Sequence, residues 1–202
     1  FWHVVSSSVS PARDRHHPHL AAVQVGDPGM IPGLLQTAEY ARDLLHLPSG
    51  PGSLGATEAD IDHIIAVRLQ RQQVLYDPSR RVHVVILEGA LRTRLCGVNA
   101  LTGQLDRLSA VAGLPSLDLG IVPDEAPVPI FPVSGFRLYD DLVTLETISG
   151  DQQLNEPDDL AYYERLFELL QESAQHGKDA AAIARRALSD LQQQQAADGP
   201  GT

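Results

Sequence analysis

The sequence has a single cysteine, Cys96, so no disulfide can form within the chain. One thiol also cannot supply the cysteine pairs of zinc and redox motifs, and a chain without disulfides is typical of the reducing cytoplasm. We therefore expect a cytoplasmic protein in which Cys96 is a small core residue without redox or metal chemistry.

Long apolar runs and basic residues are also scarce. The apolar residues 1–5 are followed by serines at 6–8, before a signal peptide or a membrane span could form, so we expect no export and no membrane insertion. Lys and Arg total 15 against 26 Asp and Glu, and the net charge of -11 repels phosphate backbones. The chain by itself is therefore not expected to bind nucleic acid.

The common signatures of hydrolases and of metal and nucleotide sites are absent. The chain has no G-x-S-x-G, H-E-x-x-H or C-x-x-C motif. Glycines in residues 50–55 match the G-x-G-x-x-G spacing, but a helical segment precedes them, Pro51 interrupts them, and Ala56 stands where a P-loop would place lysine. The histidines of residues 16–19 lie in a segment without predicted structure. We expect no cofactor, no metal and no enzymatic activity.

Apolar residues recur at helical spacing before the centre of the chain. One helix is predicted from Leu34 to Leu45, ending before Pro48. Thr57 followed by Asp60 is typical of a helix N-cap, and the second helix that it begins runs to Leu75.

The middle of the chain favours strands. Residues 82–88 are densely apolar and β-branched, and a second strand at 117–122 follows two short helical segments, so the two strands are predicted to be parallel. Residues 136–139 and 142–148 predict a hairpin around Asp140 and Asp141. Between them, residues 123–132 contain four prolines and are predicted to form a lid-like loop.

Two helices are predicted at the end of the chain, over residues 160–174 with Gly177 as the C-cap glycine, and over 181–191. The predicted fold is α+β, a small mixed four-stranded sheet with a crossover and a hairpin, flanked by N- and C-terminal helices. Residues 1–20 are predicted to be a flexible lead-in, 21–191 the folded domain, and 192–202 a disordered tail.

Two carboxylates, Glu88 and Glu146, stand in otherwise apolar strands. A buried acid is costly unless it is paired, so each is expected to meet an arginine, a backbone amide or a ligand. The candidate partners are Arg68, Arg71 and Arg92. A structural ion pair is favoured, and a small-molecule hydrolase or lyase that uses Glu88 or Glu146 as a base is the alternative.

A string of residues in the first predicted helix carries a family resemblance. Ile31-Pro32-Gly33-Leu34-Leu35-Gln36-Thr37, followed by Glu39-Tyr40-Ala41-Arg42, resembles the C-terminal domain of WhiJ-like, XRE-type helix-turn-helix regulators of Streptomyces and other actinobacteria. Further matching strings follow in the same order: 68–72, 85–88, 90–92, 104–105, 121–123, 135–140, 143–147 and 162–164.

The resemblance implies a sensory or partner-binding module of a transcription regulator. In such proteins the domain lies behind a DNA-binding domain and is often encoded beside a small acidic or mixed-charge protein, in toxin-antitoxin-like pairs. About twenty residues precede the matching region here, fewer than a DNA-binding domain needs. Two other departures are residues 21–24, where the family tends to carry a Glu-Ala pair, and Leu87, where an Asp often stands.

Two binding surfaces follow from this interpretation. One is the string around residue 36, where Gln36 is taken as exposed; its alternative role is to set the entry angle of a helix. The other is a pocket at the strand ends, near Glu88 and Glu146 and covered by the loop of residues 123–132. It is expected to bind a small-molecule effector or, as an antitoxin-like module would, a small neighbouring protein. Homodimerisation is left open. The candidate residues are Ile31, Pro32, Gly33, Leu34, Gln36, Thr37, Tyr40, Arg68, Arg71, Glu88, Arg92, Phe136 and Glu146.

Overall fold

The computed structural model describes residues 22–27, 29–130, 132–139, 141–147 and 150–198. The strands are β1 (Ala22–Asp27), β2 (Arg81–Leu87), β3 (Leu117–Val122), β4 (Phe136–Tyr139), β5 (Leu142–Thr147), β6 (Gly150–Leu154) and β7 (Gln175–His176). The α-helices are α2 (Ala38–Leu45), α3 (Glu58–Arg71), α4 (Gly89–Arg92), α5 (Val98–Val111), α6 (Pro157–Ser173) and α7 (Gly177–Asp198). Short 3-10 turns occupy η1 (Gly33–Leu35), η2 (Pro51–Leu54) and η3 (Gln72–Tyr76). The predicted lead-in lies outside the described residues.

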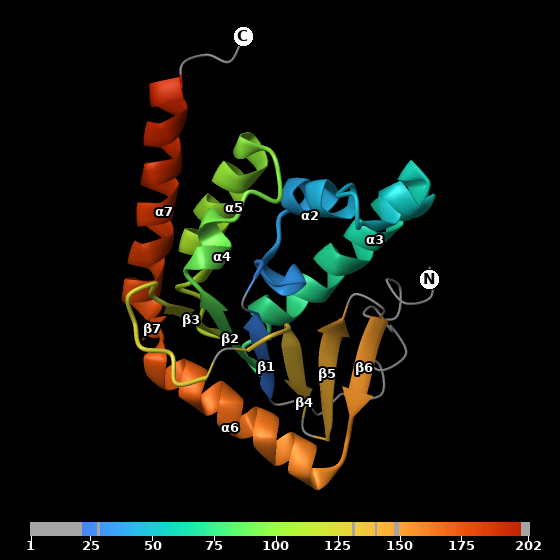
Figure 1. The fold of residues 1–202 in the computed structure, drawn as a ribbon, viewed down its shortest axis with the longest axis vertical. Coiled ribbons are helices and arrows are strands. Elements are labelled where there is room, and N and C mark those ends of the chain that lie inside the picture. The colour runs from blue at the N-terminus through green and yellow to red at the C-terminus, as the bar shows by residue number, and fades with distance from the viewer. Residues whose placement is uncertain (1–21, 28, 131, 140, 148–149, 199–202) are drawn as a thin grey trace.

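The described strands form one mixed sheet in the order β6-β5-β4-β1-β2-β3-β7 (Figure 1). β1, β2 and β3 are parallel, and β4 runs antiparallel to β1. The predicted α+β class, the parallel crossover and the hairpin of β4 with β5 are confirmed. The predicted count of four strands is wrong, because β1, β6 and β7 join the same sheet.

Each missed strand has a weak sequence signal. β1 follows directly on the segment predicted as a lead-in, β6 has the polar sequence GDQQL, and β7 has only two residues. Neither polarity nor a length of two residues gives the alternating pattern that predicts a strand. β1, β6 and β7 become strands because other strands of the chain pair with them.

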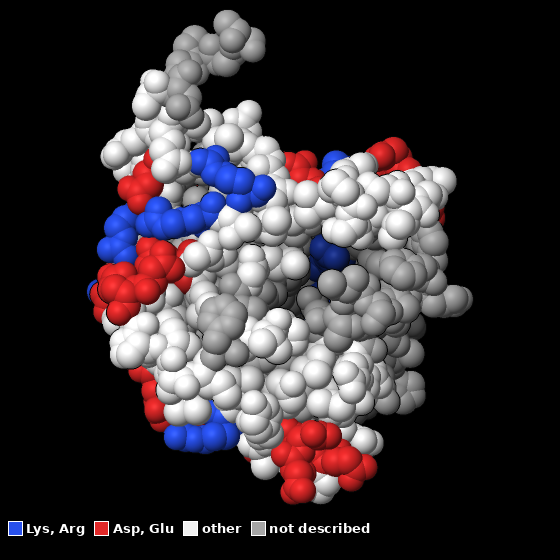
Figure 2. Space-filling view, in the orientation of Figure 1, with Lys and Arg blue, Asp and Glu red and all other residues white. Residues whose placement is uncertain are grey.

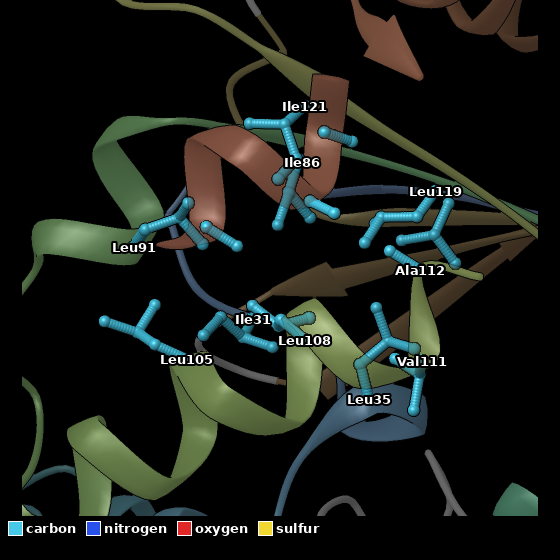
Figure 3. Packing of buried hydrophobic residues seen from close by; sticks show 14 of the residues in the cluster. Ile31, Leu35, Ile86, Leu91, Leu105, Leu108, Val111, Ala112, Leu119 and Ile121 are labelled. Carbon is cyan, nitrogen blue, oxygen red and sulfur yellow. The ribbon is translucent and has the colours of Figure 1, made fainter. Parts of the chain in front are cut away.

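Helices cover both faces of the sheet, and the faces differ in what they bury. Alternate residues of β2 and β3 point to one face, where they pack with η1, α5 and α7; Figure 3 shows Leu35, Leu108 and Ile121 in this cluster. The other face packs against α6 through Val85, Val122 and residues of the hairpin. The parallel strands are therefore buried on both sides, which explains their nearly continuous apolar sequence.

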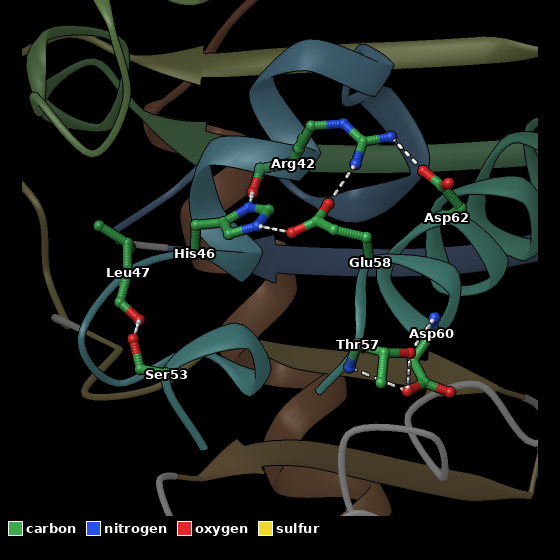
Figure 4. A network of polar contacts seen from close by, with 8 residues as sticks. All are labelled: Arg42, His46, Leu47, Ser53, Thr57, Glu58, Asp60 and Asp62. Carbon is green, nitrogen blue, oxygen red and sulfur yellow. Dashed lines mark hydrogen bonds and ion pairs between the residues drawn. The ribbon is translucent and has the colours of Figure 1, made fainter. Parts of the chain in front are cut away.

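α2 and α3 form a smaller apolar cluster through Ala41, Leu45 and Ile61. Polar contacts join the two helices at their exposed surface (Figure 4). Arg42 forms ion pairs with Asp62 and, at 3.3 Å, with Glu58, whose other oxygen lies 2.9 Å from Nε2 of His46.

Several helix ends depart from the sequence predictions. The Thr57–Asp60 capping box is confirmed, but the first predicted helix is split into η1 and α2, which begins after its N-cap Thr37. α6 ends at Ser173 with Ala174 as its C-cap, so Gly177 does not cap it; this glycine has a φ of 54° at the start of α7.

The predicted disordered tail is also corrected, because α7 continues to Asp198. Residues 192–198 contain glutamine and alanine, which favour helix once a preceding packed segment has nucleated it. Residues 199–202 lie outside the described part of the chain. In that described part, no helix combines the length and the apolar character needed to cross a membrane.

Candidate functional site

The string that carries the family resemblance is mostly buried. Ile31, Pro32 and Tyr40 belong to the buried residues, and only 2% of Gln36 is exposed. The prediction that Gln36 lies on the surface is therefore wrong. Gly33, Leu34 and Thr37 are half-buried. The string does not form an exposed binding surface, and its role in shaping the chain is the one that the structure supports.

Glutamines hold the backbone of this string. Gln36 donates from Nε2 to the Ile31 carbonyl at 2.7 Å. Gln104 of α5, which is 0% exposed, donates to the Leu35 carbonyl at 2.9 Å and accepts from the Thr37 amide at 2.7 Å. These backbone carbonyl and amide groups thus form hydrogen bonds with buried side chains, as polar groups that are shielded from water must do to remain stable.

Arginines complete the same network. Gln72 donates to the Gln36 carbonyl at 2.7 Å, and it accepts from Arg107 of α5 at 2.6 Å. Arg68 of α3 donates to Oε1 of Gln36 at 2.9 Å. Arg68 therefore serves the string around Gln36. Arg71 is a half-buried residue at the end of α3.

The structure brings Glu88 together with Arg92 and a residue that the sequence did not indicate. Glu88 follows β2 and is 3% exposed. Its Oε1 lies 3.1 Å from Arg92 of α4 and 3.5 Å from Arg186 of α7, and its Oε2 accepts from the Asp124 amide at 3.3 Å. The prediction of a paired buried carboxylate is confirmed for Glu88, with Arg92 as a correct partner.

The ion pair at Glu88 is the first in a row of side-chain contacts between α7 and the segment that follows β2. Arg92 also binds Asp190 at 2.8 Å, and the hydrogen bonds to Asp190 and Glu88 raise the pKa of its guanidinium. Arg94 donates to Gln194 at 2.7 Å. The α7 residues 186, 190 and 194 are spaced by four and lie on one side of the helix, so these contacts hold this part of α7 against the segment that follows β2.

Connections leave the sheet in opposite directions at the carboxyl ends of β2 and β3. After β2 the chain enters the cluster of α5 and α7 through Leu91. After β3 it turns to the α6 face, where Val128 and Ile130 pack and Ser173 donates to the Pro127 carbonyl at 3.3 Å. We call the point between these two connections, formed by Glu88, Gly89 and Asp124, the switch point. In open α/β sheets, ligands bind at such a point.

The described loop residues 123–130 and 132–135 lie between β3 and β4 in the chain. β4 is antiparallel to β1, so its first residue lies beside the carboxyl end of β1, where Gly26 pairs with Phe136. The predicted lid therefore lies at the predicted edge, but its apolar side chains anchor it to the α6 face.

Phe136 does not join Glu88. Phe136 is a core residue that packs against Phe167 and Tyr163, and a Cβ on Gly26 would lie 2.5 Å from its ring. The side chain of Glu146 lies outside the described residues. Its strand, β5, is separated from β2 by β4 and β1, which places the two strands about 14 Å apart. The predicted pocket near both acids would have to span this distance, and it stays a prediction.

The structure contains a second polar cluster, of His83, Asp118 and His176, that was not predicted from the sequence. Nδ1 of His83 lies 3.3 Å from one oxygen of Asp118, and Nδ1 of His176 lies 2.8 Å from the other. His176 also lies 3.2 Å from the Gln171 carbonyl, so it ties β7 and the end of α6 to β3. Within the described ranges, no group of His, Cys, Asp and Glu is suited to a metal ion. These contacts give His83 and His176 a structural role around β3.

A family model described as a domain of unknown function, DUF5753, matches residues 21–186. The chain belongs to the DUF5753 family. No curated protein and no solved structure matches the chain. The matched range extends from the residue before β1 into α7, so both Glu88 and Arg186 lie within the DUF5753 domain.

Proposed function

We propose that this DUF5753 domain is the sensing module of a helix-turn-helix transcription regulator, and that it binds its effector at the switch point. The regulator context rests on the resemblance to WhiJ-like proteins. The place of binding rests on one observation, the divergence of the chain after β2 and β3 beside Glu88 and Asp124.

The contacts of Glu88 offer a route by which binding acts at a distance. This carboxylate touches α4, α7 and the start of the loop at Asp124, so an effector that moves one of them changes the contacts of the others. The effector shifts the equilibrium between two arrangements of these elements, and thereby the orientation or the dimeric state of a linked DNA-binding domain.

The contacts of Glu88 favour a structural role over a catalytic one. One oxygen faces two guanidinium groups and the other accepts a backbone amide. A general base needs an oxygen within reach of a substrate proton. The alternative of a hydrolase or lyase built on Glu88 therefore has less support than the sensing function.

Gly89 provides a direct test, because a Cβ there would have only Asp124 Oδ1 nearby, at 3.8 Å. Gly89→Leu should fold and fill the switch point. Gly103→Leu is the matched control: it adds the same side chain to α5, where nothing lies within 4 Å. The tagged wild-type chain and both variants are incubated with a cell extract of the organism whose genome encodes the wild-type chain. The small molecules and proteins that each chain retains are identified by mass spectrometry.

The proposal predicts a species that the wild type and Gly103→Leu retain, that Gly89→Leu loses, and that is recovered unchanged. A small neighbouring protein as that species would make the domain antitoxin-like. Equal retention by all three chains, or no retained species, would contradict binding at the switch point. Chemical conversion of the species would show an enzyme.

A further inference from the structure

We propose that the effector carries an oxyanion, a phosphate or carboxylate group on a small molecule, which binds between Arg92 and Arg186. This inference rests on the proposed sensing function and adds the chemical class of the ligand. It is carried by the convergence of two guanidinium groups from different helices on one buried carboxylate oxygen, next to the switch point.

The acids around the two arginines satisfy only part of their N–H donors. Oε1 of Glu88 is shared between both guanidinium groups, at 3.1 and 3.5 Å. Arg92 has a second partner in Asp190, whereas the long contact to Glu88 is the sole ion pair of Arg186 to described residues. Most of the five N–H donors of Arg186 are thus available to a ligand.

Further positive charge surrounds this pair in a chain whose net charge is -11. Arg94 lies two residues beyond Arg92, and the exposed Arg185 adjoins Arg186. Figure 2 shows basic side chains gathered over α4 and α7, with acidic side chains next to them. These arginines offer positive charge to small anions at this surface, and Glu88 and Asp190 offset part of it.

The exposed fractions of the three side chains show which of them faces solvent. Glu88 is 3% exposed, but the side chains of Arg92 and Arg186 are 38% and 54% exposed. The carboxylate therefore lies beneath the guanidinium groups and orients them, and their outer N–H groups face solvent. Planar guanidinium forks bind phosphate and carboxylate with paired hydrogen bonds, so an oxyanion fits above Glu88.

The test is a titration of the wild-type chain with inorganic phosphate, at an ionic strength held constant with sodium chloride. Binding is followed by isothermal calorimetry and by the NMR signals of the arginine Nε–H groups. We expect saturable binding that moves the signals of Arg92 and Arg186. In Arg186→Gln the dissociation constant should rise about tenfold or more. The control, Arg165→Gln, removes a 59% exposed, ion-paired arginine on α6 and should bind as the wild type does.

Absence of saturable binding, or equal binding by Arg186→Gln, would overturn the inference. The arginine signals of the wild type give a second readout that needs no variant, and shifts confined to other arginines would also overturn it. If phosphate does not bind but Gly89→Leu still loses a captured species that lacks an oxyanion, the sensing function stands and the ligand class is wrong.

Discussion

At the scale of residues, Gln104 bonds two backbone polar groups of the buried network. It is 0% exposed and bonds both the Leu35 carbonyl and the Thr37 amide. Gln104→Ala leaves both groups without these partners and should lower the free energy of unfolding by about 1–3 kcal/mol in urea denaturation. Gln70→Ala, an exposed glutamine of α3, is the control and should change little. Equal losses would show that the network adds no stability.

Cys96 gives a second prediction at this scale. Burial, and then the nearby Asp43 carboxylate, raise the pKa of its thiol to about 11. At pH 8 the reactive thiolate is therefore rare, and iodoacetamide should alkylate the folded chain much more slowly than the chain in urea, as measured by mass spectrometry. Equally fast alkylation in both states would contradict this assignment.

Local contacts were predictable from the sequence, and distant ones were not. Thr57 and Asp60 are three residues apart, and Glu88 and Arg92 are four apart, so both pairs follow from helical geometry. Arg186 is 98 residues from Glu88, and nothing in the spacing joins them. Gln36 was placed at the surface because it is polar, although acceptors and donors from other elements make its burial favourable.

At the scale of elements, the contact of α2 with α3 should depend on pH. The hydrogen bond to Glu58, and then the Arg42 carbonyl, raise the pKa of His46. A raised pKa means that the protonated form stabilises the fold: this contribution is complete below the unfolded value of about 6.5 and is lost as the pH rises through the folded value.

His46→Gln tests this dependence. The wild type should lose part of its advantage over His46→Gln as the pH is raised above about 6.5, measured as the urea midpoint of each protein across the range. The effect should be small, because the pair is exposed to solvent and salt screens it. Parallel curves for the two proteins would show that the contact of His46 with Glu58 does not stabilise the helix pair.

Elements with a strong internal pattern were predicted, and elements defined by their neighbours were missed. β2 and β3 consist mainly of apolar residues, and α5 and α6 repeat apolar residues at helical spacing. β7 becomes a strand because its two residues pair with Gly120 and Ile121 of β3. The glutamine-rich end of α7 is helical as the continuation of a helix that packs through Ala184 and Leu191.

At the scale of the whole molecule, the charge balance predicts no specific binding of DNA by this chain. A net charge of -11 opposes the approach of a phosphate backbone, and the basic surface over α4 and α7 is confined to a small area beside Asp190. A gel-shift assay with the 202-residue chain should show no specific retardation of a promoter fragment. Specific binding at nanomolar concentration would place a DNA reader within this domain.

The sequence predicted the position of the switch point only roughly. The order of strand, helices, strand and hairpin predicted a parallel pair followed by a return of the chain, and Glu88 was predicted at the end of the first strand, where the structure has it. The faces to which the two connections turn depend on tertiary packing, and so does the approach of α7. These are the features that make Glu88 a junction of three segments.

The central claim is that an effector binds at the switch point. It is tested most directly by NMR mapping of the species that the wild-type chain captures from extract. The account predicts that the largest amide shifts occur at Gly89, Asp124 and neighbouring residues, and that they vanish in Gly89→Leu but persist in Gly103→Leu. Shifts centred on another surface, or conversion of the species during the titration, would contradict it.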